Sequence, residues 1–245
     1  MDELKPDFAA LVAWARRYPQ GAAAVFLFAA GVVALSCGVA SLAGALFGAG
    51  AALLGAWVTQ WNTQRSSAAE KSGREANARR YMTPELRRVV ERVLHIHNRA
   101  IVNYSAHALQ MQAPNDKKDD FVPIRPVLYP SAPQFHDLPG EDALALIELY
   151  DSLNEIDRLV HEWYDRDDPG PRENFYNVVL EAADKSLGRA HLCIERFDLD
   201  SAYPPKNPMI GTLLERVVKA IGETPKVRES VIRKREALSE SAHRQ

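Results

Sequence analysis

The sequence ASLAGALFGAGAALLGA occupies residues 40–56 and lies inside a longer uncharged run. No Asp, Glu, Lys or Arg occurs from Tyr18 to Gln64, and residues 21–58 are almost entirely apolar. As a single helix, residues 21–58 would measure about 57 Å, about twice the ~30 Å hydrocarbon core of a bilayer. The run therefore predicts a transmembrane hairpin, with spans at about 21–40 and 42–61 and a short turn near 38–41.

Basic residues flank this run on both sides. Arg16 and Arg17 precede it, and Arg65 is the first of several that follow. The positive-inside rule then places both ends in the cytoplasm, as a hairpin requires, and Trp57 and Trp61 fall where interfacial aromatic residues are expected. Ala-rich and Arg-rich composition is typical of a GC-rich bacterium. We therefore expect a multi-pass protein of the bacterial inner (cytoplasmic) membrane with both termini cytoplasmic.

Two other interpretations of the run agree less well with the sequence. A secretory or lipoprotein signal ending at Cys37 would have an acidic leader and would be followed by about twenty further apolar residues, unlike processed signals. A buried hairpin of a soluble protein would have to be covered by about 180 remaining residues that have cores of their own. The membrane hairpin is preferred over both.

Small residues in the second span recur every fourth position. Helices associate in a bilayer by close packing, which small residues at this spacing allow, although such spacing also arises readily in any stretch rich in Ala and Gly. The sequence does not decide whether the partner is the first span or another protomer. The predicted packing ridge consists of Ala40, Gly44, Gly48, Ala52 and Ala56.

Charge is distributed unevenly beyond the hairpin. Residues 65–112 carry nine basic and four acidic residues, residues 113–204 carry nine and twenty, and residues 205–245 carry nine and five. A basic segment next to the bilayer suits an anionic leaflet, whereas the acidic centre disfavours nucleic acid as a partner. The two cysteines, Cys37 and Cys193, imply no disulfide framework and are compatible with a reducing cytoplasm.

Apolar residues beyond the hairpin recur at helical spacing. The first predicted helix begins at Thr83-Pro84 and carries an apolar stripe from Leu86 to Met111. Further helices are predicted at residues 141–164, 172–197, 207–222 and 224–245. Six prolines in residues 113–140 exclude regular helix, yet this segment is too apolar for a disordered linker. We expect it to form an ordered, extended strap across the helices.

These elements predict an all-α fold, in which a two-helix transmembrane hairpin precedes a cytoplasmic helical bundle with a long proline-rich strap. The expected organisation is a short amphipathic juxtamembrane segment (1–20), the hairpin (21–61), a basic, helical juxtamembrane linker (62–82), the bundle (83–222, with the strap at 113–140) and a basic C-terminal helix or tail (223–245).

Two motifs resemble metal sites. The sequence HEWYD places His161 and Asp165 four residues apart, with Glu162 between them, in the manner of a zinc-protease helix, but the nearest further histidine, His191, lies about 21 Å away along the expected helix pair. Asp165 and Asp167 also begin a calcium-loop pattern that puts Tyr176 where a bidentate Glu is needed. Solvated acidic residues and an ordinary turn are the preferred interpretations, and no metal or cofactor is expected.

The remaining polar motifs carry no chemistry that we can assign. His95 and His97 are two residues apart, so on a helix they point in different directions; we expect His97 to be a hydrogen-bonded core residue and His95 to be solvated. The sequence contains no Gly-rich phosphate loop, no GxSxG and no CxxC motif. A non-enzymatic role is therefore favoured.

Two hypotheses about function remain. In the first, the hairpin anchors a cytoplasmic interaction or scaffold module that self-associates through the ridge and binds an unidentified cytoplasmic protein. In the second, the hairpin perturbs the membrane as the effector of a bacterial defence or toxin system, with the bundle as sensor. The partners expected in both are the lipid bilayer and a second copy of the chain.

Overall fold

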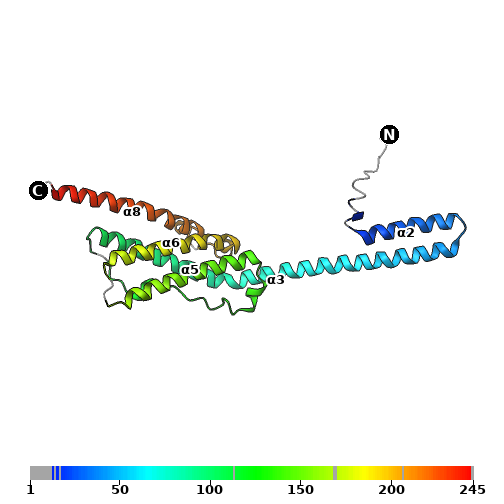
Figure 1. Ribbon diagram of the computed structural model, residues 1–245, viewed down its shortest axis with the longest axis horizontal. Helices are drawn as coiled ribbons and strands as arrows, with labels where there is room; N and C mark the ends of the chain where they lie inside the picture. The colour runs from blue at the N-terminus through cyan, green and yellow to red at the C-terminus, as the bar shows by residue number, and fades with distance from the viewer. Residues whose placement is uncertain are drawn as a thin grey trace, which may run out of the picture. The chain divides into compact units, whose positions relative to one another are not determined.

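The chain is almost entirely helical in its computed structural model (Figure 1), which describes residues 13, 15–16, 18–112, 114–167, 170–205 and 207–243. No strand occurs in these ranges. The chain forms two compact units that divide after Gly73. The all-helical class predicted from the sequence is confirmed, whereas Arg17 and most of the predicted juxtamembrane segment lie outside the described residues.

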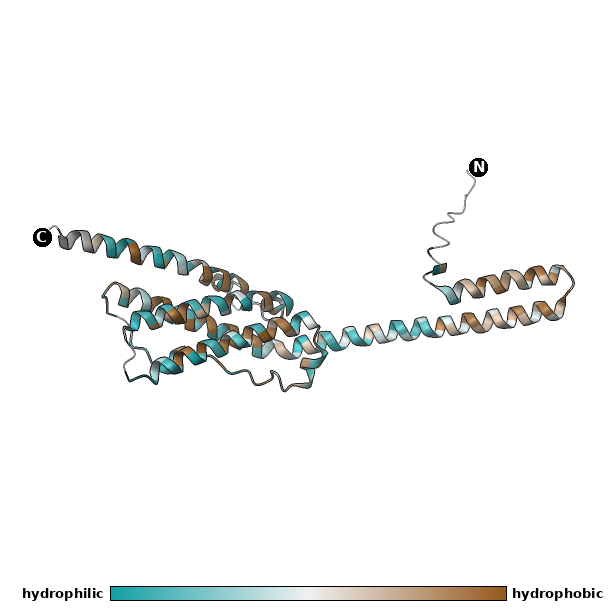
Figure 2. Cartoon of the chain, viewed as in Figure 1, coloured by the Kyte–Doolittle hydropathy of each residue, from teal (hydrophilic) through white to brown (hydrophobic). Residues whose placement is uncertain are grey.

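The first unit contains two antiparallel helices. Helix α2 (Pro19–Ser36) is joined to the start of α3 (Ala40–Ala108) by a turn at residues 37–39 (Figure 1). Gly38 adopts a left-handed conformation there (φ 79°), which glycine accepts without a steric penalty. Figure 2 shows α2 and the adjoining part of α3 as predominantly apolar, and both helices are long and apolar enough to cross a membrane.

Aromatic rings and glycines hold these two helices together. The rings of Phe28 and Phe47 lie 6.0 Å apart between centroids. A Cβ atom added at Gly31 would come within 2.9 Å of the Phe47 ring, and one added at Gly50 within 3.1 Å of the Phe28 ring. Glycine at both positions therefore allows each phenylalanine to lie against the opposite backbone.

The predicted helix start at Thr83-Pro84 is wrong, because α3 continues through Pro84. Proline removes the N–H that would bind the carbonyl of Arg80. The Thr83 hydroxyl replaces it, donating a hydrogen bond of 2.9 Å to that carbonyl oxygen. The predicted linker at 62–82 is therefore part of one helix. At its other end α3 stops at Ala108, so Met111, expected on the apolar stripe, is 64% exposed.

The second unit is a bundle of α3 from Arg74 onward, α5 (Gly140–Tyr164), α6 (Arg172–Arg196) and α8 (Leu213–His243). The predicted ranges of α5 and α6 differ from the observed ones by one residue each. One core cluster is centred on Leu86, Leu149 and Leu187, and a second on Ile156, Phe175 and Tyr176. Helix α6 contacts both α5 and α8, as Figure 1 shows.

Helix α8 corrects a second predicted boundary. Residues 207–222 and 224–245 were expected to form two helices separated at Gly222, but α8 is continuous from Leu213 and includes Pro225. Its start is also later than predicted, because Pro208–Ile210 forms the short 3₁₀ helix η2. The short helix α7 (Leu199–Ala202) precedes this region.

Over its described residues, the strap contains no long regular helix, as its six prolines predict, but it is only partly extended. Helix α4 (Lys118–Phe121), a turn at residues 129–131 and the 3₁₀ helix η1 (Pro133–Asp137) interrupt it between residue 114 and Pro139. Phe121 is fully buried and Leu138 is nearly so. These two side chains attach the strap to the second and first core clusters respectively.

Candidate functional site

The residues of the predicted packing ridge lie outside the contact between α3 and α2. Ala40, Gly44, Gly48, Ala52 and Ala56 are all exposed. An added Cβ at Gly44 or Gly48 would meet no atom within 4 Å. The contact with α2 instead uses the neighbouring face, where Ala43 and Gly50 are buried. Within the hairpin, the ridge is therefore left without a packing partner.

The predicted interface residues gather at the open end of the hairpin. The rings of Tyr18 and Trp57 meet edge to face, with centroids 6.1 Å apart. The Arg65 guanidinium lies over the Trp61 ring, 5.7 Å from its centroid, and Arg16 is exposed. Arg17 lies outside the described residues. Arg65, the first charged residue after the apolar run, thus lies beside Trp61.

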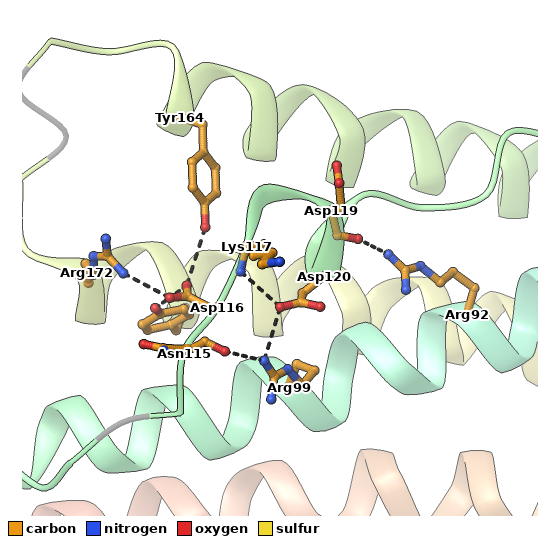
Figure 3. A network of polar contacts seen from close by, with 10 residues as sticks. Arg92, Arg99, Asn115, Asp116, Lys117, Asp119, Asp120, Tyr164 and Arg172 are labelled. Atoms are coloured by element: carbon orange, nitrogen blue, oxygen red, sulfur yellow. Dashed lines mark hydrogen bonds and ion pairs between the residues drawn. The ribbon is translucent and has the colours of Figure 1, made fainter.

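The beginning of the strap is held by a buried carboxylate in the bundle (Figure 3). Asp116 accepts hydrogen bonds from Arg172 Nη1 (2.9 Å), Tyr176 Oη (2.5 Å) and Tyr164 Oη (3.4 Å), and only 5% of its side chain is exposed. Burial, assisted by the Asp116 charge, raises the pKa of Tyr164 to about 12. The pKa of Tyr176 is raised for the same reasons. Both phenols therefore remain hydrogen-bond donors at neutral pH.

Two arginines of α3 hold the next turn of the strap (Figure 3). Arg99 Nη2 donates to the Asn115 carbonyl oxygen (2.7 Å) and to Asp120 Oδ2 (3.1 Å). The hydrogen bond from the Lys117 N–H and, to a smaller extent, the hydrogen bond from Arg99 lower the pKa of the Asp120 carboxyl group. Arg92 donates to the carbonyl oxygens of Asp119 and Val122. Arg92 and Arg99 are seven residues apart, so they project from the same face of α3.

A third contact holds the middle of the strap. Glu85 is 2% exposed, and its Oε2 accepts hydrogen bonds from the backbone N–H groups of Val127 (2.7 Å) and Leu128 (2.8 Å). Its Oε1 accepts a hydrogen bond from Tyr150 Oη (3.3 Å). Burial and the Glu85 charge raise the pKa of Tyr150, so this phenol also stays protonated.

These contacts hold the strap backbone while leaving several of its side chains outside the core. Val127 is 76% exposed although its own N–H is bound by Glu85. Ile124 is exposed, and the side chain of Arg125, which pairs with Asp157 at 3.3 Å, is 80% exposed. The segment from Val122 to Leu128 is therefore a display loop: a loop with a fixed backbone that presents apolar and basic side chains to solvent.

The candidate metal ligands at the end of α5 and in the turn after it bind different partners. His161 Nδ1 is 2.9 Å from the Asp157 carbonyl oxygen, Glu162 pairs with Arg158 at 2.6 Å, and Asp165 pairs with Lys118 at 2.9 Å. Asp167 is exposed. Tyr176, at the last calcium-loop position, binds Asp116. In the described part of the chain, no three His, Cys, Asp or Glu residues are close enough to hold a metal ion.

The prediction for the two α3 histidines is confirmed. His95 is exposed, whereas His97 is fully buried, with Nε2 2.9 Å from Thr224 Oγ1. The Thr224 hydroxyl donates to Asp184 Oδ1 (3.0 Å). Because that hydroxyl has only one proton, we assign the Nε2–H form to His97. The three side chains connect α3, α8 and α6.

Sequence inspection did not identify the residues that hold the strap. The sequence offers only a weak indication of these residues. Arg92 and Arg99 share a helix face, and Glu85 immediately precedes Leu86, the first residue of the apolar stripe. Their partners lie 16 to 43 residues further along the chain, a separation that periodicity does not address. Comparison with known proteins identifies no matching family model, curated protein or solved structure.

Proposed function

We propose that the chain is a membrane-anchored, non-enzymatic interaction module that self-associates through its second span. In this proposal α2 and the first part of α3 cross the bacterial inner membrane as a hairpin, with both termini in the cytoplasm. The bundle then acts on the cytoplasmic side as a scaffold for a protein partner.

The observation that carries the proposal is the outward-facing apolar surface of the hairpin. Phe26 is 71% exposed and Val33 is 61% exposed, while the residues buried between the helices are mostly glycine and alanine. Soluble monomers rarely expose contiguous apolar surface of this extent. Lipid chains would cover it. The exposed apolar residues include Val25, Phe26, Val32, Val33, Leu35, Leu42 and Val58.

The dimensions of the hairpin also suit a bilayer. The 18 residues of α2 measure about 27 Å, close to the ~30 Å hydrocarbon core. Along α3, Trp57 and Trp61 lie about 26 and 32 Å from Ala40, at the depth of the opposite interface. Except at the helix ends, the backbone N–H and C=O groups of such a hairpin bind one another within each helix, as the interior of a bilayer requires.

Self-association is supported by the position of the ridge. Its small residues would let another helix approach closely, and α2 does not occupy them. A second copy presents the same uncharged surface, so two ridges can pack without burying a charge. The ridge is therefore assigned to contact between protomers, the alternative that the sequence left open.

Partner binding is assigned to the display loop of the strap. Its backbone is already ordered by Glu85 and Arg92, so binding there costs little conformational entropy. Val127→Asp is expected to abolish capture of the partner from cytoplasmic extract, whereas Val178→Asp, an exposed valine on α6, leaves it unchanged. Equal capture of the partner by both variants would show that the display loop is not the binding site.

The test of the main proposal is cross-linking of the full chain in native membranes, comparing Gly48→Leu with Ala49→Leu. Both positions are exposed on α3, but they point about 100° apart around the helix. A Cβ atom added at Gly48 meets no atom within 4 Å, so we expect insertion to be preserved. We expect Gly48→Leu to reduce the cross-linked dimer about fivefold or more and Ala49→Leu to have little effect.

Two results would contradict the proposal in different ways. Undiminished cross-linking by Gly48→Leu would remove the ridge as the contact between protomers but leave the anchor intact. Release of the wild-type chain from membranes by alkaline carbonate would show that the hairpin is not embedded, and the anchoring role would fail.

A further inference from the structure

A pocket lies at the open end of the hairpin. It is lined by residues 18–20 together with Trp57, Gln60, Trp61 and Gln64, all from the first unit. Its volume of about 170 Å³ is more than ten times the ~10–15 Å³ that one water molecule needs. The pocket therefore has room for a polar group of several atoms.

The lining of the pocket suits an anion. The lining residues include two tryptophans and three glutamines, and the indole N–H and amide groups of these side chains are hydrogen-bond donors. The Arg65 guanidinium over the Trp61 ring adds a positive charge beside the lining. From Tyr18 to Ala69 the sequence contains no Asp or Glu, so no carboxylate from this stretch opposes a bound anion.

The N-terminus of α2 also favours a bound anion. Pro19 is its first residue, and the first intrahelical hydrogen bond joins the Ala22 N–H to the Tyr18 carbonyl oxygen (3.0 Å). The N–H groups of Gln20 and Gly21 consequently have no acceptor within the helix, and the Tyr18 side chain does not cap them. The helix dipole favours negative charge at this end. This contribution supports the donors that line the pocket.

The depth of the pocket identifies the source of the anion. Residues 57–64 cover about 10 Å along α3. This segment begins near the end of a ~30 Å apolar span and extends into the headgroup layer. At this depth the abundant anion is the phosphodiester of a lipid. Because the span continues directly into the pocket, a lipid bound there would keep its acyl chains along the apolar surface of the hairpin.

We propose that this pocket binds the phosphodiester of an anionic phospholipid headgroup, with Gln60 and Gln64 as donors and Arg65 as the countercharge. The inference rests on the proposed membrane insertion of the hairpin and adds a specific lipid site to it. A bound headgroup would fix α2 against α3 at their open end, next to the Tyr18 and Trp57 ring contact.

The test uses the full chain reconstituted into nanodiscs of phosphatidylcholine with a minority of phosphatidylglycerol. After extraction into detergent, native mass spectrometry counts the lipids that each chain retains. The wild type is expected to retain phosphatidylglycerol in preference to phosphatidylcholine. Gln60→Leu and Arg65→Gln should each lower that preference about fivefold or more, as expected for the loss of a hydrogen bond to a charged group.

Asn62→Leu is the matched control, because Asn62 is an exposed amide on the same helix that does not line the pocket. It should retain phosphatidylglycerol as the wild type does. Equal retention of both lipids by the wild type, or equal loss in the control and the pocket variants, would overturn the proposal.

A second arm separates the two sources of phosphate. Glycerol phosphate added to the delipidated chain in detergent should not be retained without acyl chains; retention of glycerol phosphate would assign the pocket to a soluble phosphate and overturn the lipid assignment. Failure of insertion is recognised separately, since a chain that is not embedded is extracted by carbonate whatever lipid it prefers.

Discussion

The hydroxyl of Thr83 donates a hydrogen bond of 2.9 Å to the carbonyl oxygen of Arg80, the acceptor that loses its helical donor at Pro84. Thr83 is 5% exposed, so water does not readily replace this bond. The contact allows α3 to continue through a proline at a position where the sequence pattern predicts a helix to begin.

Replacing Thr83 with valine should therefore destabilise the bundle. A carbonyl oxygen that loses its donor beside a buried side chain costs about 1–3 kcal/mol, which would lower the melting temperature of the full chain in detergent by several degrees. Thr83→Ser keeps the hydroxyl and should melt close to the wild type. Circular dichroism measures both; equal melting of the valine and serine variants would show that the hydroxyl is dispensable.

Glu85→Gln should loosen the middle of the strap. The variant keeps the shape of the side chain but removes the charge that strengthens the hydrogen bonds from Val127 and Leu128. Hydrogen exchange of these two amides should accelerate about tenfold. Glu91→Gln, which alters a half-exposed pair with Arg87, is the control and should leave their exchange unchanged.

The two cysteines should differ sharply in reactivity. Cys37 is exposed at the turn of the hairpin, whereas Cys193 is buried and burial raises the pKa of its thiol to about 12. In intact spheroplasts, a membrane-impermeant maleimide should label Cys37 from the periplasmic side, and Cys193 should remain unmodified even after lysis without denaturant. Labelling of Cys37 only after lysis would contradict the proposed topology, and Cys37→Ser controls for the site.

The raised pKa of Cys193 also predicts a pH dependence of stability. Between pH 9 and 12 the unfolded thiol releases its proton while the folded thiol retains it, so the unfolding free energy decreases as the pH rises, by up to about 1.4 kcal/mol per pH unit. Below pH 9 this contribution is constant. Chemical unfolding of the wild type and Cys193→Ala should show a shallower decrease for the alanine variant.

Gly50→Leu should disrupt the hairpin where Gly48→Leu does not. A Cβ at Gly50 lies 3.1 Å from the Phe28 ring, whereas one at Gly48 meets nothing within 4 Å. Heating followed by size-exclusion chromatography in detergent should show a smaller monodisperse fraction for Gly50→Leu. Similar fractions for the two variants would mean that Phe28 moves aside freely.

Induced expression in a bacterial host should leave the membrane potential unchanged. No charged residue occurs from Tyr18 to Gln64, so the spans offer no charged group to line an ion-conducting path. A voltage-sensitive dye measures the potential in wild-type and Gly48→Leu cells. Depolarisation by the wild type that the substitution abolishes would favour the membrane-perturbing effector hypothesis instead.

The sequence by itself determined the elements whose signals are local. Absence of charge and helix length predicted the two apolar helices, and the spacing of apolar residues located α5 and α6 to within one residue. Six prolines predicted the strap. In each case the decisive property, hydropathy or periodicity, is repeated over a dozen or more neighbouring residues, so a single exception does not obscure it.

Tertiary structure decided the features that depend on contacts between distant residues. The sequence could not show that Thr83 would compensate for Pro84, that Thr224 would join His97 and Asp184 beside Pro225, or which strap groups Glu85 would bind. It also left open which face of α3 packs on α2, because the ridge and the packing face are both built from small residues. Only three-dimensional packing, which leaves Gly48 exposed and closes Gly50 against Phe28, distinguishes them.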